Sequence, residues 1–128
     1  MAIAFAKRAF QIAGIWGLVI LSLVYGAYLL GLEGVTFDTD RPDIVHGFFL
    51  VTLAWQVAFL LIATDPVRYR PLMLAAMLEK FPFTLAVLVL YANGQVPQTM
   101  LVLGLIDGLL GVLFSIAYIW TDPASVTE

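Results

Sequence analysis

Four long apolar runs, separated by short polar segments, dominate the chain. They cover about residues 11–32, 43–64, 71–92 and 98–120. Each run reaches the length of about 20 residues that a helix needs to cross a hydrocarbon core about 30 Å thick. In lipid, a helix lets a single chain satisfy all of its backbone polar groups internally. The pattern therefore predicts an all-α, polytopic membrane protein with one four-helix transmembrane domain over residues 1–128.

The connections between the apolar runs are short, which favours consecutive helices that run antiparallel. Asn93 and Gly94 follow the third run, and Pro97 precedes the fourth. Residues of these types are typical of helix ends. We therefore expect an up-down four-transmembrane-helix bundle.

The basic residues are distributed unevenly among the connections. Lys7 and Arg8 precede the main part of the first run, and Arg68 and Arg70 lie between the second and third runs. The first connection holds Arg41 among several acidic residues, and the third connection is uncharged. Because lysine and arginine are enriched in cytoplasmic loops, this pattern predicts that both termini are cytoplasmic.

Composition supports the membrane class and excludes several functions. The chain is 62% hydrophobic and 12% charged, whereas soluble domains are about 45–50% apolar and about 25% charged. It contains no cysteine, which excludes disulfides, thiolate metal sites and cysteine nucleophiles. The net charge is −3 and there is no basic run, so we expect no nucleic-acid partner.

The acidic segment before the second run is a candidate metal site. It offers Asp38, Asp40, Asp43 and His46 as oxygen and nitrogen ligands. However, an EF-hand loop that began at Asp38 would need glycine at about its sixth position and glutamate at about its twelfth, where this chain has Asp43 and Phe49. We therefore expect no metal ion and no cofactor.

Charged residues lie deep inside two of the predicted spans. The stretch Leu72–Tyr91 carries Glu79, Lys80 and Pro82 near its middle, and the fourth run carries Asp107. With a rise of about 1.5 Å per residue, Glu79 and Asp107 reach a common layer in the central and outer half of the membrane. A charge at the bilayer centre costs about 2.5–3.5 kcal/mol on insertion scales, so these residues need an explanation.

Other polar and aromatic residues reach similar depths on the first two helices. Gln56, Thr52 and Tyr25 are predicted near the same layer, with Trp55 beside Gln56 and His46 at the outer mouth. Trp55 is also explained by ordinary core packing. His46 is also explained by an interfacial role or by a hydrogen bond to a neighbouring acid. Together these residues predict the lining of a polar centre.

Two interpretations of this polar centre stay open. Lys80 could pair with Asp107 or Glu79 only to fix the register of the helices, since buried ion pairs can specify an arrangement without adding stability. Alternatively, the charged residues form a ligand or proton site, because ionisable residues inside a membrane are functional candidates. A bend at Pro82 would help Lys80 and Glu79 to face the bundle together.

The layout resembles the small bacterial four-helix membrane proteins that are called DoxX-like. The resemblance covers the number, length and hairpin spacing of the helices, and it is most specific in the segment GLIDGLLGVLFSIAY, residues Gly104–Tyr118. It implies a multi-pass protein of the bacterial inner (plasma) membrane. A looser similarity, carried by Glu79 and Asp107, links the chain to sterol-isomerase-like bundles that place acids around a lipid pocket.

The leading functional hypothesis is an intramembrane pocket that binds a small hydrophobic molecule, such as a lipid, a sterol-like compound or a quinone. Glu79 and Asp107 would be its hydrogen-bonding or acid/base groups, and Lys80 their counter-ion. If the protein is an enzyme, proton-transfer isomerisation is the chemistry that these groups support. One alternative is an accessory subunit of a membrane complex that docks a partner subunit. Another is a proton-coupled transporter that works as a homo-oligomer. Membrane lipids are expected partners in every case.

Overall fold

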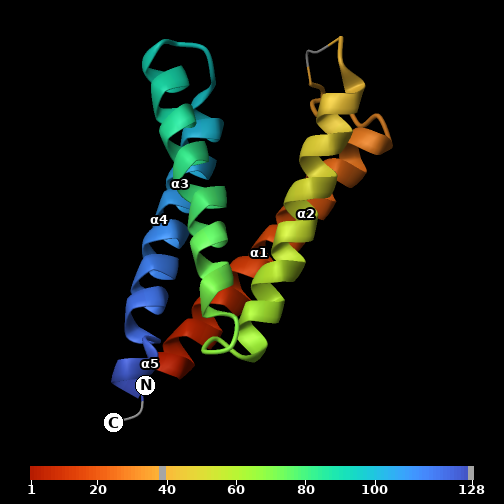
Figure 1. The fold of residues 1–128 in the computed structure, drawn as a ribbon. Coiled ribbons are helices and arrows are strands. Elements are labelled where there is room, and N and C mark those ends of the chain that lie inside the picture. Colours follow the sequence, from red (N-terminus) through yellow and green to blue (C-terminus); the bar gives the residue numbers. More distant parts are fainter. Residues whose placement is uncertain (38–39, 127–128) are drawn as a thin grey trace.

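The computed structural model describes residues 1–37 and 40–126, and every regular element in them is a helix (Figure 1). The elements are α1 (Ala2–Leu29), α2 (Pro42–Thr64), α3 (Arg70–Ala92), α4 (Gln98–Trp120) and the short α5 (Pro123–Val126). Consecutive long helices run antiparallel; α1 packs on α2, α3 packs on α4, and the two pairs meet mainly through α1 and α4. The prediction of an all-α, up-down four-helix bundle is thus confirmed for the described residues.

The first helix has different bounds from those expected. The apolar run predicted a helix over residues 11–32, but α1 begins at Ala2 and ends at Leu29. Its first turns are rich in alanine, which is the strongest helix former, so the helix extends across the exposed Lys7 and Arg8. Hydrophobicity alone therefore underestimated the helix at its charged start.

A glycine sets the other end of α1. Gly31 has a φ of 65°, which a residue with a side chain adopts only with strain. The Gly31 amide donates to the Tyr28 carbonyl and the Leu32 amide donates to the Ala27 carbonyl, both at 3.1 Å. These two bonds form a Schellman cap, so the helix stops before the last apolar residues of the run.

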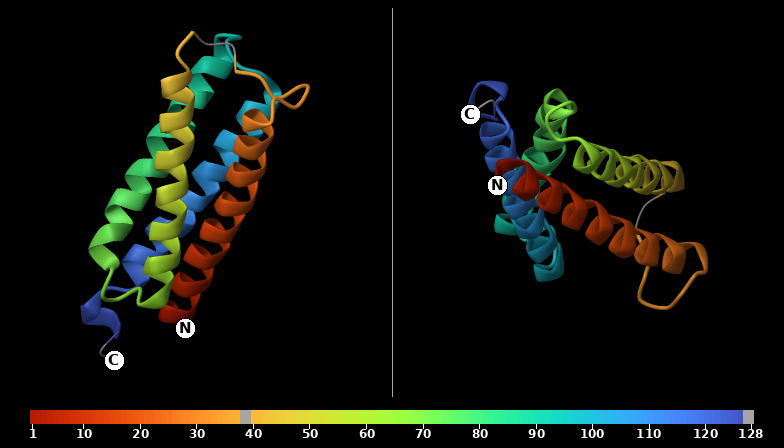
Figure 2. Two further views of the ribbon diagram at one scale, coloured as in Figure 1. Left: turned by 90° about the vertical axis from the view of Figure 1, so that its right-hand side faces the viewer. Right: turned by 90° about the horizontal axis from the view of Figure 1, so that it is seen from below.

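The four helices form two hairpins that diverge. The α1–α2 hairpin and the α3–α4 hairpin meet at one end and separate toward the other (Figures 1 and 2). The closed end holds the N-terminus, the connection between α2 and α3, and α5. The open end holds the connection between α1 and α2 and the connection between α3 and α4. The molecule is therefore V-shaped, and only the closed end joins the hairpins tightly.

Aromatic rings join the two hairpins at the closed end. Phe114 of α4 stacks on Phe10 of α1 at 4.1 Å between ring centroids and lies 5.0 Å from Phe59 of α2. All three rings are fully buried. The other buried residues of this core, which come from all four helices, are Ala6, Ala13, Ile62, Ala63, Met73, Ala76, Leu110 and Ala117. This core joins the α1–α2 hairpin to the α3–α4 hairpin.

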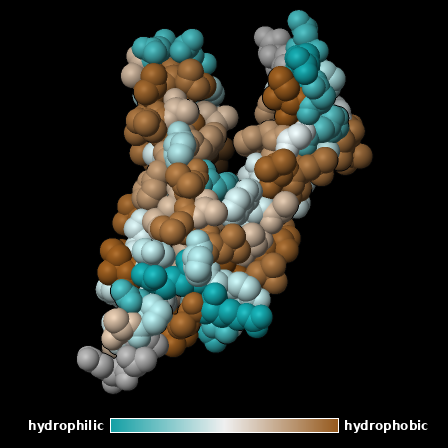
Figure 3. Space-filling model, in the orientation of Figure 1, coloured by the Kyte–Doolittle hydropathy of each residue, from teal (hydrophilic) through white to brown (hydrophobic). Residues whose placement is uncertain are grey.

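The long helices have the properties of membrane spans. Each is long and apolar enough to cross a bilayer, and no more than 28% of each span is buried inside the protein. Apolar side chains cover the length of both hairpins, and hydrophilic residues gather chiefly toward their ends (Figure 3). The chain is therefore a four-pass integral membrane protein, with exposed helix faces that suit lipid rather than water.

Within the second hairpin, α3 and α4 approach closely at Gly104. Thr84 donates its hydroxyl to the Gly104 carbonyl at 2.8 Å, and a Cβ at Gly104 would lie 2.8 Å from Val87 Cγ1. We expect Gly104→Leu to lower the free energy of unfolding by about 1–3 kcal/mol, because overpacking pushes the two helices apart. Thermal unfolding in detergent measures the effect.

The matched control is Gly26→Leu in α1, because a Cβ at Gly26 would meet nothing within 4 Å. It should leave the midpoint of thermal unfolding unchanged or slightly raised. Equal losses for the two variants would show that the Gly104 contact does not limit the approach of the helices.

Candidate functional site

A cavity of about 370 Å³ lies between the two hairpins, beyond the closed-end core. All four long helices contribute to its lining. Its walls are mainly apolar and carry the aromatic side chains Trp16, Phe37, Phe48, Phe49, Trp55 and Phe83. Figure 3 shows the hollow between the arms of the V in which it lies. In size and lining it resembles sites that hold small molecules, which typically measure about 300–1,000 Å³.

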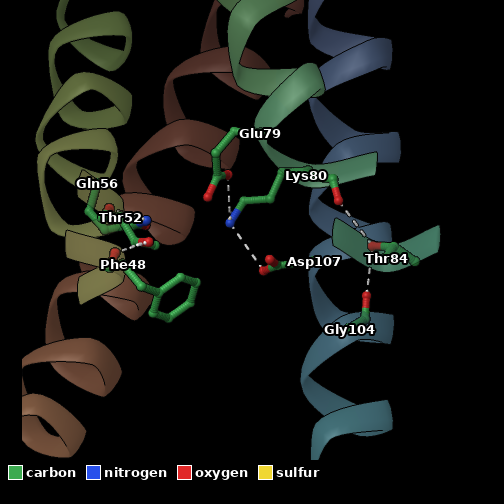
Figure 4. A network of polar contacts seen from close by, with 8 residues as sticks. All are labelled: Phe48, Thr52, Gln56, Glu79, Lys80, Thr84, Gly104 and Asp107. Carbon is green, nitrogen blue, oxygen red and sulfur yellow. Dashed lines mark hydrogen bonds and ion pairs between the residues drawn. The ribbon is translucent and has the colours of Figure 1, made fainter. Parts of the chain in front are cut away.

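Three ionisable side chains meet at this cavity. Lys80 Nζ donates to Asp107 Oδ1 at 3.0 Å and lies 3.2 Å from Glu79 Oε2 (Figure 4). The side chains of Lys80, Glu79 and Asp107 are 5%, 16% and 22% exposed, respectively. Lys80 also lies 5.3 Å from the centre of the Phe59 ring. The cation is therefore the most buried member, and the two carboxylates are the more accessible ones.

The length of the lysine side chain brings this cluster together. Glu79 and Lys80 are consecutive on α3, so their Cα–Cβ bonds point about 100° apart on the helix. The flexible stem of Lys80 carries Nζ to Glu79 and across to Asp107 on α4. α3 continues through Pro82 as one helix. The cluster thus links α3 to α4 as well as facing the cavity.

A buried glutamine lies on the opposite wall. Gln56 of α2 is 1% exposed, and its Nε2 donates to the Thr52 carbonyl at 3.0 Å. Its Oε1 has no hydrogen-bond partner among the described residues. A Cβ at Gly17 of α1 would overlap this oxygen, so only glycine leaves room for the glutamine at that position. Figure 4 shows Gln56 and Thr52 across from the charged cluster.

Glu79 has a buried oxygen that is ion-paired but accepts no hydrogen bond from any described residue. Its buried Oε2 is close to Lys80 Nζ, but the contact lacks hydrogen-bond geometry, and no other described residue donates to it. Gln56 Oε1 and Glu79 Oε2 are both enclosed by protein atoms, so neither oxygen is open to the cavity.

The structure separates the residues that the sequence suggested for this site. Trp55, Gln56, Thr52, Glu79, Lys80 and Asp107 line one cavity. Tyr25 and His46 are not among the lining residues. The Tyr25 hydroxyl and His46 Nδ1 share a hydrogen bond of 2.8 Å, and Tyr25 stacks on Phe49 at 5.0 Å. Tyr25 and His46 therefore join α1 to α2 within the first hairpin.

The acidic segment shows no metal centre in its described part. Asp43 pairs with Arg41 at 2.6 Å, and both side chains are exposed. Asp38 lies outside the described residues. Within residues 1–37 and 40–126, no group of three or more acidic or histidine side chains has the spacing of a metal site.

Sequence reasoning missed part of the cavity wall on α1 and α4. Trp16 and Gly17 of α1 and Leu103 of α4 line the cavity, although none carries an obvious chemical signal. The pairing of a small residue with a buried amide was the available signal for Gly17, since Gln56 needs a neighbour without a side chain. Trp16 and Leu103 look like ordinary lipid-facing or packing residues.

No protein family, curated protein or solved structure matches this chain. The DoxX-like resemblance therefore stays a prediction.

Proposed function

We propose that this protein binds a small, mostly apolar molecule in the cavity between its hairpins. The apolar part of the molecule would lie against the aromatic and aliphatic walls. Its polar end would reach Glu79 and Asp107. The observation that carries the proposal is the meeting of three ionisable side chains from α3 and α4 at an apolar cavity of about 370 Å³ inside a membrane bundle.

The geometry favours a binding site over an ion pair that only fixes helix register. A pair with that sole role needs no accessible surface, because its geometry and its hydrogen bonds to neighbouring groups offset the loss of solvation. Here Glu79 and Asp107 both retain accessible surface at a cavity.

The same two carboxyl groups would exchange a proton with a bound molecule if the protein is an enzyme. A general acid or base must lie within hydrogen-bond reach of the proton that it transfers, and Glu79 and Asp107 are the acids that line the cavity. These groups support acid/base isomerisation of the bound molecule. Binding in the cavity would be the first step of that reaction.

We further propose that the closed end faces the cytoplasm of a bacterial inner membrane. Lys7, Arg8 and Arg68 are exposed at this end, whereas Arg41 at the open end is paired with Asp43. Lysine and arginine favour the cytoplasmic side. In that orientation the cavity lies toward the outer half of the membrane.

Native mass spectrometry of protein extracted in a mild, uncharged detergent tests the binding proposal. We expect a small molecule to co-purify with the wild type and its occupancy to fall about tenfold or more in Leu103→Trp, because the indole fills the cavity. The control is Leu105→Trp, which makes the same change on α4 at a residue outside the lining. Leu103 and Leu105 are 41% and 51% exposed, so both accept a larger side chain.

The control variant should keep the molecule at the wild-type level. Two results would count against the proposal. One is a molecule that both variants retain equally. The other is a wild-type preparation that carries only a partner protein, as expected for an accessory subunit.

A further inference from the structure

We propose that the polar end of the bound molecule is a protonated amine. This inference rests on the proposed function, and it names the class of ligand that the cavity takes. Its first support is the charge at the cavity. Glu79 and Asp107 supply two carboxylates, and Lys80 is the one cationic side chain among the lining residues. With both carboxyl groups ionised, the cluster holds an excess negative charge, which a cationic ligand would neutralise.

The second support is the order in which the charges are buried. Lys80 is almost fully buried, and its Nζ is already occupied by Glu79 and Asp107. Its ammonium is therefore poorly placed to receive an anionic ligand from the cavity. The carboxylates are the more exposed partners, so the cavity presents hydrogen-bond acceptors to an incoming molecule.

The alternative head groups fit less well. A carboxylate or phosphate would bring a further negative charge against Glu79 and Asp107, where like charges repel. A hydroxyl would donate one hydrogen bond but leave the excess charge in place. The aromatic rings of Trp16, Trp55 and Phe48 line the same cavity and would also favour a cation near their faces.

A matched series of probes tests the inference: decylamine, 1-decanol and decanoic acid, which share a tail and differ in the head group. Each is titrated at neutral pH into delipidated protein in an uncharged detergent, and bound probe is counted by native mass spectrometry. We expect the wild type to bind decylamine at least about tenfold more tightly than either other probe. Glu79→Gln and Asp107→Asn should each remove most of this preference, because each removes the excess charge.

Leu103→Trp separates the cavity from the protein surface, because it leaves every charge in place and fills the cavity. It should abolish the preference for the amine. If the preference persists in this variant, the amine binds elsewhere and the inference is wrong. If the wild type binds decanol or decanoic acid as tightly as decylamine, the inference is wrong while the cavity proposal stands. If no probe binds, or if Leu103→Trp weakens none of them, both proposals are wrong.

Discussion

Replacing Lys80 with methionine is expected to lower the free energy of unfolding by about 3–5 kcal/mol, which is the usual cost of removing one partner from a buried ionic network. Lys80 is the cation between Glu79 and Asp107, with its Nζ 3.2 Å and 3.0 Å from their oxygens. Without it, the two carboxyls share an apolar cavity with no counter-ion. They must then either repel each other or take up a proton. Methionine keeps most of the length of the lysine stem, so the change isolates the charge.

Reversible unfolding in mixed micelles, followed by tryptophan fluorescence, measures this loss. The decisive control is the triple variant Glu79→Gln, Lys80→Met, Asp107→Asn, which removes all three charges together. It should recover most of the lost stability, because no uncompensated charge is left inside the bundle. If the triple variant is as unstable as Lys80→Met alone, uncompensated carboxylates are not the cause of the loss.

Truncating Phe114 to alanine is expected to loosen the junction of the two hairpins and to cost about 2–3 kcal/mol. The same truncation in the core of a soluble protein costs about 3–5 kcal/mol. The expected loss is smaller here because lipid, and not water, contacts the helices when they separate. Phe114 is fully buried and contacts the rings of Phe10 and Phe59. Its loss opens a cavity at the point where α1, α2 and α4 meet.

The separation of the arms reports this effect directly. The chain has no cysteine, so spin labels can be attached at Glu33→Cys and Gln95→Cys on the exposed connections of the open end. The distribution of distances between the labels should broaden in Phe114→Ala. It should stay narrow in Phe48→Ala, whose ring is exposed and lies outside the closed-end core. An unchanged distribution in Phe114→Ala would show that other contacts hold the hairpins at their angle.

The helix pattern was largely readable from the sequence because lipid imposes a strict length on apolar runs. The expected second, third and fourth helices began near residues 43, 71 and 98, and α2, α3 and α4 begin at Pro42, Arg70 and Gln98. The same criterion failed at the start of α1. There the chain stays helical through Lys7 and Arg8 because of its alanines and its contact with the core.

The position of each residue along its helix also followed from the sequence. The surface that its side chain lines did not. A rise of about 1.5 Å per residue places Tyr25, Gln56 and Asp107 at comparable heights. It does not say how the hairpins are paired or how far they diverge. Gln56 and Asp107 face the cavity between hairpins, whereas Tyr25 faces His46 within one hairpin. Sequence reasoning therefore grouped residues that share a height but not a surface.

By itself, the sequence determined that this protein crosses a membrane with four antiparallel helices and carries Glu79, Lys80 and Asp107 at depth. The tertiary structure decided what surrounds those charges. The rings of Phe10, Phe59 and Phe114 pack the two hairpins together at one end only. The hairpins therefore diverge toward the other end and leave a cavity beside the charges. The physical reason is that local hydrophobicity selects helices and their depth, whereas the angle between hairpins depends on contacts among residues far apart in the chain.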